Sequence, residues 1–144
     1  MKSSELLLNK IIDFEGRKLT AYKCPAGVWT IGVGHTKGVK HGQTITKAQA
    51  MSLLKGDLLP CENYVNNLGV CKTQGQFDAM VDFVFNLGTA ALGRSTLLKY
   101  IRQGKAEQYI REEFAKWVNS KGMRLKGLVI RRQWEADRYF GKEA

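Results

Sequence analysis

Residues 15–36 constrain the fold of this chain more than any other part of its sequence. Glu15 stands at the end of an amphipathic helical pattern, and Gly16 follows it. Glycine ends helices because it adopts the left-handed C-terminal conformation at little cost. On either side of Pro25-Ala26-Gly27, which is typical of a turn, two stretches alternate in polarity. The region therefore predicts a helix with an acid at its end, followed by a β-hairpin.

An acid in this place can act as a proton donor if the hairpin partly desolvates it. Burial of a carboxyl group disfavours its charged form and raises its pKa. Val28 and Ile31 are candidates for the apolar wall around Glu15. Strand side chains alternate, so Thr30 would present its hydroxyl on the face opposite to Trp29 and Ile31, where it can bind a water molecule.

The order and spacing of three residues carry a family resemblance. Eight residues separate Glu15 from Cys24, and five separate Cys24 from Thr30. This pattern resembles the phage-type lysozymes of glycoside hydrolase family 24, the endolysins of tailed bacteriophages. Further matches cover nearly the whole chain: residues 30–36 (TIGVGHT), 76–80 with 85–88, 95–98 and 127–132. Cys24 is the departure, since many members carry Asp there, although other members also have Cys.

The resemblance implies a muramidase (lysozyme, a glycoside hydrolase) that hydrolyses the β-1,4 bond between N-acetylmuramic acid and N-acetylglucosamine in peptidoglycan. In that role Glu15 is the general acid, and Cys24 and Thr30 position or activate a water molecule. The thiol has three further interpretations: a thiolate base, a nucleophile, or a packing residue. We expect the reaction to need no metal ion and no cofactor.

The resemblance also implies roles outside this region. Phe85 and Asn86, at the end of a strongly apolar helical pattern, would help to hold the sugar chain. We expect His35 to form a structural pair with an acid. Either Arg131 and Arg132 form a solvated basic face, or one of them pairs with Glu15 or an acidic neighbour. The resemblance supports an arginine here without deciding which one, and we favour Arg131 as the supporting residue.

The element order predicts an α+β fold that is mostly helical. It is a lysozyme-like arrangement with a small β-hairpin or sheet lobe, a larger helical lobe and a cleft between them. We expect a single domain over residues 1–144, with the sheet lobe at about 15–45 and a bridging helix at about 46–68. The helical lobe would cover about 73–141 together with the N-terminal helix. Pro60 predicts a kink or break in the bridging helix.

Composition limits the possible partners and bonds. The net charge of +10 predicts an anionic partner, which is consistent with peptidoglycan but also with a basic non-catalytic module that binds cell wall or nucleic acid. Of these two alternatives we expect the enzyme, and we expect it to act as a monomer and not to bind nucleic acid. Cys61 and Cys71 could form a disulfide bond with each other. Cys24 could instead form a disulfide with one of them, which would inactivate the site under oxidising conditions. We favour free thiols over both alternatives.

The beginning of the chain does not have the pattern of a signal peptide, because charged residues interrupt a short apolar run. No stretch approaches the length of a membrane span, so we expect no stable membrane insertion. We therefore expect synthesis in the host cytoplasm and action on the periplasmic cell wall. The resemblance implies that a holin, a phage-encoded membrane pore, gives access to the wall.

Overall fold

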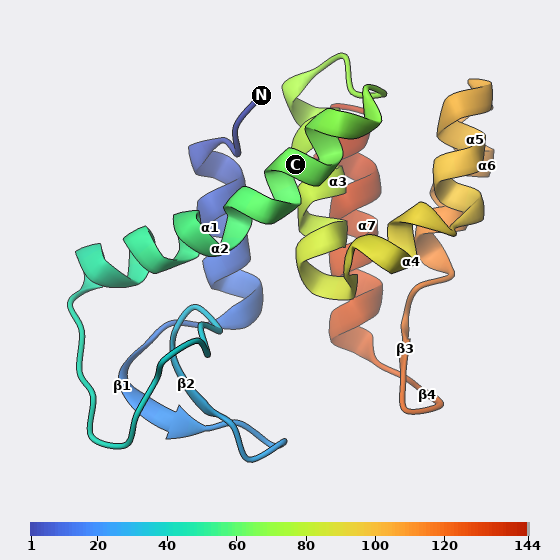
Figure 1. The fold of residues 1–144 in the computed structure, drawn as a ribbon. Helices are drawn as coiled ribbons and strands as arrows, with labels where there is room; N and C mark the ends of the chain where they lie inside the picture. Colours follow the sequence, from blue (N-terminus) through green and yellow to red (C-terminus); the bar gives the residue numbers. More distant parts are fainter. Residues whose placement is uncertain (144) are drawn as a thin grey trace. The chain divides into compact units, whose positions relative to one another are not determined.

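The computed structural model describes residues 1–143, which form seven helices and two small β-hairpins (Figure 1). The elements in chain order are α1 (Glu5–Glu15), β1 (Lys18–Lys23), β2 (Trp29–Gly32), α2 (Lys47–Leu68), α3 (Gln74–Leu87), α4 (Thr89–Gly93), α5 (Thr96–Gln103), α6 (Glu107–Ala115), β3 (Asn119–Ser120), β4 (Met123–Arg124) and α7 (Lys126–Tyr139). The predicted class, a mostly helical α+β fold, is confirmed.

Contacts within the chain divide it into two compact units. One unit is Glu5–Pro60, and the other joins Met1–Ser4 to the chain from Cys61 onward. The sequence groups the N-terminal helix with the helical lobe, whereas these contacts group α1 with the hairpin. The predicted break at Pro60 is absent, since α2 continues through this residue, but the boundary between the units falls there.

The first unit is built on the predicted hairpin. Strands β1 and β2 are antiparallel and pair Tyr22 with Thr30. The chain then returns along the other edge of β1, where the Ala21 N–H donates to the carbonyl of Gln43 at 2.9 Å. A capping box stands at the start of α2, because Thr46 and Gln49 each donate a backbone N–H to the other's side chain.

The second unit has its core on α3, which packs against α7. Residues 77–84 of α3 are all buried, so the middle of this helix is enclosed on every side. Thr73 caps the helix by accepting from the Gln76 N–H at 3.1 Å, and Ser95 caps α5 by accepting from the Leu98 N–H at 3.0 Å. The short helix α4 and the hairpin of β3 and β4 are additions to the predicted element order.

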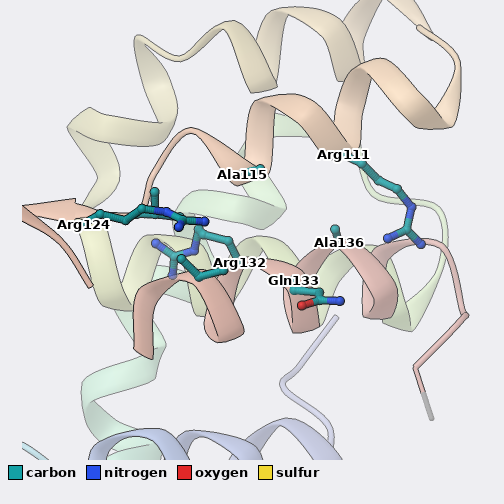
Figure 2. A pocket seen from close by; sticks show the side chains of 8 residues that line it. Arg111, Ala115, Arg124, Arg132, Gln133 and Ala136 are labelled. Atoms are coloured by element: carbon teal, nitrogen blue, oxygen red, sulfur yellow. The ribbon is translucent and has the colours of Figure 1, made fainter. Parts of the chain in front are cut away.

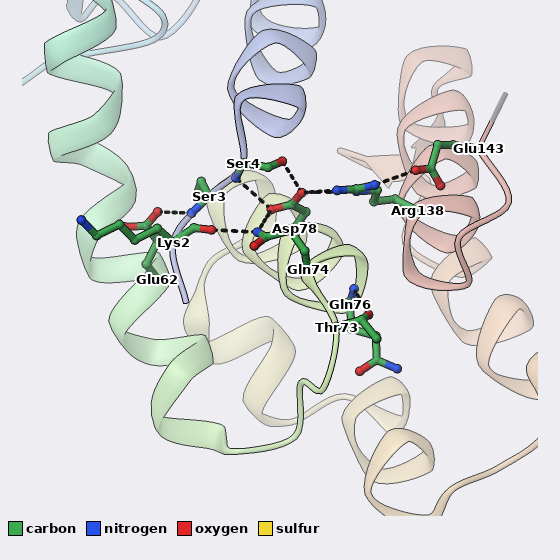
Figure 3. A network of polar contacts seen from close by, with 10 residues as sticks. All are labelled: Lys2, Ser3, Ser4, Glu62, Thr73, Gln74, Gln76, Asp78, Arg138 and Glu143. Atoms are coloured by element: carbon green, nitrogen blue, oxygen red, sulfur yellow. Dashed lines mark hydrogen bonds and ion pairs between the residues drawn. The ribbon is translucent and has the colours of Figure 1, made fainter.

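A buried carboxylate on α3 anchors both ends of the second unit (Figure 3). Asp78 accepts from the backbone N–H and the hydroxyl of Ser4 and from the Gln74 amide. Arg138 of α7 donates to the same carboxylate at 2.8 Å and pairs with Glu143 at 2.7 Å. The Asp78 side chain is fully buried, so this network satisfies a charge that would otherwise be costly.

Two further findings concern the predictions about disulfide bonds and membrane-spanning helices. The three cysteines, all in the part of the chain that the structure describes, are free thiols. Among residues 1–143, no helix combines the length and the apolar character needed to cross a bilayer.

Candidate active site

Glu15 is the last residue of α1, and its side chain is exposed. The helix ends there because Gly16 takes a φ of 77°, and its N–H donates to the Ile12 carbonyl at 2.7 Å. The expectation of a partly buried Glu15 is wrong. Val28, which was expected to cover the carboxyl, is itself 46% exposed.

The turn of the first hairpin brings Cys24 and Thr30 together. The Cys24 N–H donates to the Val28 carbonyl at 3.0 Å, and the Gly27 N–H donates to the Cys24 carbonyl at 2.8 Å. Gly27 has a φ of 80°, a conformation that glycine adopts without strain. In this geometry the Thr30 and Cys24 side chains lie close together, although five residues separate them in the sequence.

The hydroxyl of Thr30 has a fixed orientation. It donates to the Val28 carbonyl at 3.0 Å, and the residue is only 3% exposed. A hydroxyl has one proton and two lone pairs, so donation to Val28 leaves Thr30 as an acceptor for other groups. Cys24 is half-buried and is therefore the more accessible member of the pair.

Hydrogen bonds favour the ionised form of the Cys24 thiol. Backbone groups of Val28 and Ala26 contribute most, and they lower the pKa of Cys24 against the opposing effect of partial burial. A thiol with a lowered pKa contains more thiolate at neutral pH, and thiolate is the form that can accept a proton or attack carbon.

His35 lies where the chain leaves the first hairpin. Its Nδ1 is 2.8 Å from Asp57 Oδ2, and its Nε2 is 2.9 Å from the Lys37 carbonyl. The Ile31 and His35 backbones exchange hydrogen bonds at 2.9 Å. Both ring nitrogens are therefore occupied, and Asp57 of α2 is the acid partner that the sequence analysis expects for this histidine.

Phe85 and Asn86 lie near the C-terminal end of α3, and both are half-buried. Gly88, with a φ of 95°, ends the helix and donates its N–H to the Val84 carbonyl at 2.7 Å. The Asn86 side chain is fixed by α7, because its Oδ1 accepts from Arg132 Nη2 at 2.7 Å.

Arg131 and Arg132 are both buried, so the alternative of a solvated basic face is wrong. Arg131 pairs with Asp82 of α3 through Nε at 3.0 Å and Nη2 at 2.8 Å. Arg132 pairs with Glu135, donating from Nη2 to Oε2 at 2.9 Å. These contacts make the arginines part of a charge cluster inside the second unit.

The two acids of this cluster titrate in opposite directions. Burial and the neighbouring Asp82 raise the pKa of Glu135 well above its usual value. Burial opposes ionisation of Asp82 as well, but hydrogen bonds from Glu135 and Arg131 outweigh it and lower the pKa of Asp82. Glu135 therefore retains a proton more readily than Asp82. The buried cluster consists of these two carboxyl groups and the guanidinium groups of Arg131 and Arg132.

Sequence reasoning did not identify Asp82, Glu135 or the separate role of Arg132. The available signal was an acid placed among the apolar residues of α3, since Asp78 and Asp82 are four residues apart and lie on one face of a helix. A charged residue on a buried face requires a partner, and α7 supplies Arg138 and Arg131 in that order.

Arg132 also borders a cavity of about 240 Å³ in the second unit (Figure 2). Arg111, Arg124 and Gln133 contribute its polar side chains, and small apolar side chains form the remaining walls. Arg111 is paired with Glu107 and Asp137, each at 2.7 Å.

Comparison with known proteins gives a consistent result over the whole chain. The sequence profile of the family described as "Phage lysozyme" matches residues 12–135. The endolysin of Acyrthosiphon pisum secondary endosymbiont phage 1 is 41% identical over 140 residues, which are 94% of this chain and 95% of that protein. The endolysin of Bacillus phage PZA is 40% identical, but this chain spans only 54% of its length.

Solved structures agree with the sequence comparison. The endolysin from Escherichia coli O157:H7 phage FAHEc1 matches with a TM-score of 0.87 at 36% identity, covering 96% of this chain and 93% of that one. The muramidase domain of SpmX from Asticaccaulis excentricus matches with a TM-score of 0.86 at 36% identity, covering 96% of this chain and 97% of that one.

Proposed function

The chain belongs to the phage lysozyme family, and on that premise we propose that Glu15 is the general acid of a peptidoglycan-hydrolysing endolysin. The bond cleaved is the β-1,4 link between N-acetylmuramic acid and N-acetylglucosamine. One observation carries this proposal: an exposed carboxyl at the end of α1 is followed, in the same unit, by a hairpin that joins Cys24 to Thr30. Membership of a lysozyme family favours a hydrolase over a binding module without catalysis.

The chemistry divides between the acid and the hairpin. Glu15 gives its proton to the glycosidic oxygen as the bond from that oxygen to the anomeric carbon breaks. A water molecule that Thr30 orients attacks the anomeric carbon from the opposite face and loses a proton to the Cys24 thiolate. Inversion of the anomeric centre follows from this arrangement.

Further residues support binding in this proposal. Phe85 and Asn86 bind the sugar chain, the former through its ring and the latter through its amide. His35 holds the hairpin to α2 through Asp57, and Arg131 is a supporting residue of the site. None of these roles requires a metal ion or a cofactor.

The cellular setting belongs to the same proposal. The enzyme acts as a single lysozyme-like domain and as a monomer, without nucleic acid, on the periplasmic cell wall, where hydrolysis leads to host cell lysis. Its net charge of +10 draws it to an anionic wall polymer. Release of the enzyme to the wall depends on a holin. The assignment to host lysis is supported by similar proteins that are named endolysins, such as the SAR-endolysin of Escherichia phage Mu.

Replacing Glu15 by Gln tests the proposal. The amide cannot donate the proton that the leaving oxygen needs, so clearing of permeabilised Gram-negative cells should fall by about 10²–10⁴-fold. Glu5→Gln makes the same change at an exposed position of the same helix and should retain full clearing. Digestion products of the wild-type enzyme should have N-acetylmuramic acid at the new reducing end. Full activity of Glu15→Gln would exclude this residue as the acid.

A further inference from the structure

Asn86 has a side-chain amide whose two ends lie in different environments. Its Oδ1 accepts a hydrogen bond from Arg132 Nη2 at 2.7 Å. A guanidinium group has only donors, so the atom that faces it must be the oxygen and not the nitrogen of the amide. The orientation of Asn86 is therefore determined by chemistry, and a flip of the amide would place two donors against each other.

Arg132 cannot move to release this orientation. It is 1% exposed, and the same Nη2 donates to Glu135 Oε2 at 2.9 Å. Its Nε lies 2.7 Å from Glu135 Oε1, and its guanidinium carbon lies 5.3 Å from the centre of the Phe83 ring. Contacts with an acid, an amide and an aromatic ring thus fix the donor that holds Asn86.

The nitrogen end of the amide is available. Within residues 1–143, no protein group accepts a hydrogen bond from Asn86 Nδ2, and this atom is not among the buried polar atoms that lack a partner. Because an unpartnered Nδ2 without accessible surface would be among those atoms, this nitrogen retains access to solvent. Asn86 consequently offers outward two N–H donors and no acceptor.

We propose that position 86 is a donor-only specificity site, with Arg132 as the positioning residue that makes it so. This inference rests on the proposed function, in which Asn86 binds the sugar chain. A group that presents only donors selects an acceptor, and here the ligand chemistry is a carbonyl oxygen. The N-acetyl carbonyl of a sugar and the carbonyl of the lactyl-peptide arm both supply one. A sugar hydroxyl that must donate its proton finds no acceptor at this position.

Three variants test the polarity of the site through KM and kcat on short glycan strands. Asn86→Ala removes the donor, and we expect KM to rise about three- to tenfold with little change in kcat. Asn86→Asp keeps the shape and the bond to Arg132 but turns the outer end into an acceptor. It should raise KM more than Asn86→Ala does, because a carbonyl meets a carboxylate. Asn63→Asp, at an exposed position of α2, controls for the added charge.

The result that overturns the proposal is equally direct. If Asn86 binds a hydroxyl, the carboxylate of Asn86→Asp accepts its proton, and KM stays near that of the wild type. Thermal unfolding verifies the fold, since Asn86→Asp should unfold at an equal or higher temperature through its charge-assisted bond to Arg132. Failure of the proposed function is distinct, because the wild-type enzyme would then release no muropeptides.

A double variant tests Arg132 as the positioning residue. Arg132→Lys removes the fork that fixes the amide, so KM should rise in the wild-type background. In the Asn86→Ala background the same change should leave KM unaltered, because Arg132 then has no amide to orient. Equal KM increases in both backgrounds would show that Arg132 acts without Asn86. If Arg132→Lys does not fold, the Asn86 series still decides the polarity.

Glycan strands that lack the N-acetyl groups distinguish the two possible carbonyl ligands of Asn86. If the N-acetyl carbonyl is the acceptor, the wild type and Asn86→Ala should have the same KM on deacetylated strands. If the lactyl-peptide carbonyl is the acceptor, the ratio seen on acetylated strands should persist. Both results support a donor-only site, and they assign its ligand.

Discussion

Arg131 of α7 and Asp82 of α3 meet in a two-point contact inside the second unit. Nε of Arg131 donates to Oδ2 of Asp82 at 3.0 Å, and Nη2 donates to Oδ1 at 2.8 Å. The two side chains are 5% and 0% exposed. The planar guanidinium matches both carboxylate oxygens, so the pair fixes the register of the two helices as well as neutralising their charges.

Loss of one member of this pair should be costly. We expect Asp82→Ala to lower the free energy of unfolding by about 3–5 kcal/mol, because it removes the carboxylate that accepts from both Nε and Nη2 of Arg131 in the protein interior. Urea denaturation followed by circular dichroism measures this change. Glu112→Ala, at an exposed position of α6, should change stability by less than about 0.5 kcal/mol. Similar midpoints for the two variants would show that the pair contributes little.

Two helical glycines should respond in opposite ways to substitution by alanine. At Gly56, in α2, an added Cβ meets nothing within 4 Å, so Gly56→Ala should raise stability by up to about 1 kcal/mol through helix propensity. At Gly75, in α3, an added Cβ would clash with the carbonyl oxygen of Arg138. Gly75→Ala should therefore lower the melting temperature. A matching shift for both variants would contradict this packing of α3 against the end of α7.

The local features of the fold were predictable because short-range chemistry determines them. The hairpin follows from alternating residues around Pro25-Ala26-Gly27, and the start of α2 follows from the pair Thr46 and Gln49. The contact of Cys24 with Thr30 also follows from the closed turn. Each depends on residues that lie near one another along the chain.

Long-range features were not predictable in the same way. Nothing local indicates that Asp82 pairs with Arg131, since they are 49 residues apart. The prediction that Glu15 is partly buried was wrong, because the exposure of this residue depends on what surrounds the end of the helix and not on the pattern of the helix itself. The uninterrupted α2 shows that its surroundings outweigh the cost of Pro60 within a helix.

Stability should fall in alkaline solution partly through Cys71. Burial raises the pKa of this thiol to about 11. A raised folded-state pKa gives stability that is complete below the unfolded value, near 8.5, and is lost as pH rises toward the folded value. We expect the urea midpoint of the wild type to fall more than that of Cys71→Ala between about pH 8 and about pH 11.

Tyr139 provides the control for this alkaline effect. Burial, with a smaller contribution from Cys71, raises the pKa of its hydroxyl to about 12, so its own loss of stability begins at higher pH. Cys71→Ala combined with Tyr139→Phe should therefore have the flattest profile. Parallel profiles for the wild type and Cys71→Ala would show that Cys71 ionises equally in the folded and unfolded chain.

Cys24 should be the more reactive of the two thiols whose pKa values are shifted. Backbone hydrogen bonds from Val28 and Ala26 lower its pKa, whereas burial raises that of Cys71. The thiolate is the nucleophile, so iodoacetamide at neutral pH should modify Cys24 at least about tenfold faster than Cys71. Peptide mass spectrometry over a time course measures both rates. Faster labelling of Cys71 would contradict the stabilised thiolate at the hairpin turn.

The role of Cys24 in hydrolysis is tested by substitutions at the same place. If the thiolate accepts a proton from water, Cys24→Asp should retain activity and Cys24→Ser should lose it, because serine does not ionise near neutral pH. The carboxylate of Asp, with a usual pKa of about 3.9, should also shift the acidic limb of the pH–rate profile to lower pH. Full activity of Cys24→Ser would leave a packing role for Cys24. If Cys24→Asp loses activity while Cys24→Ser keeps it, the site does not tolerate a carboxylate at this position.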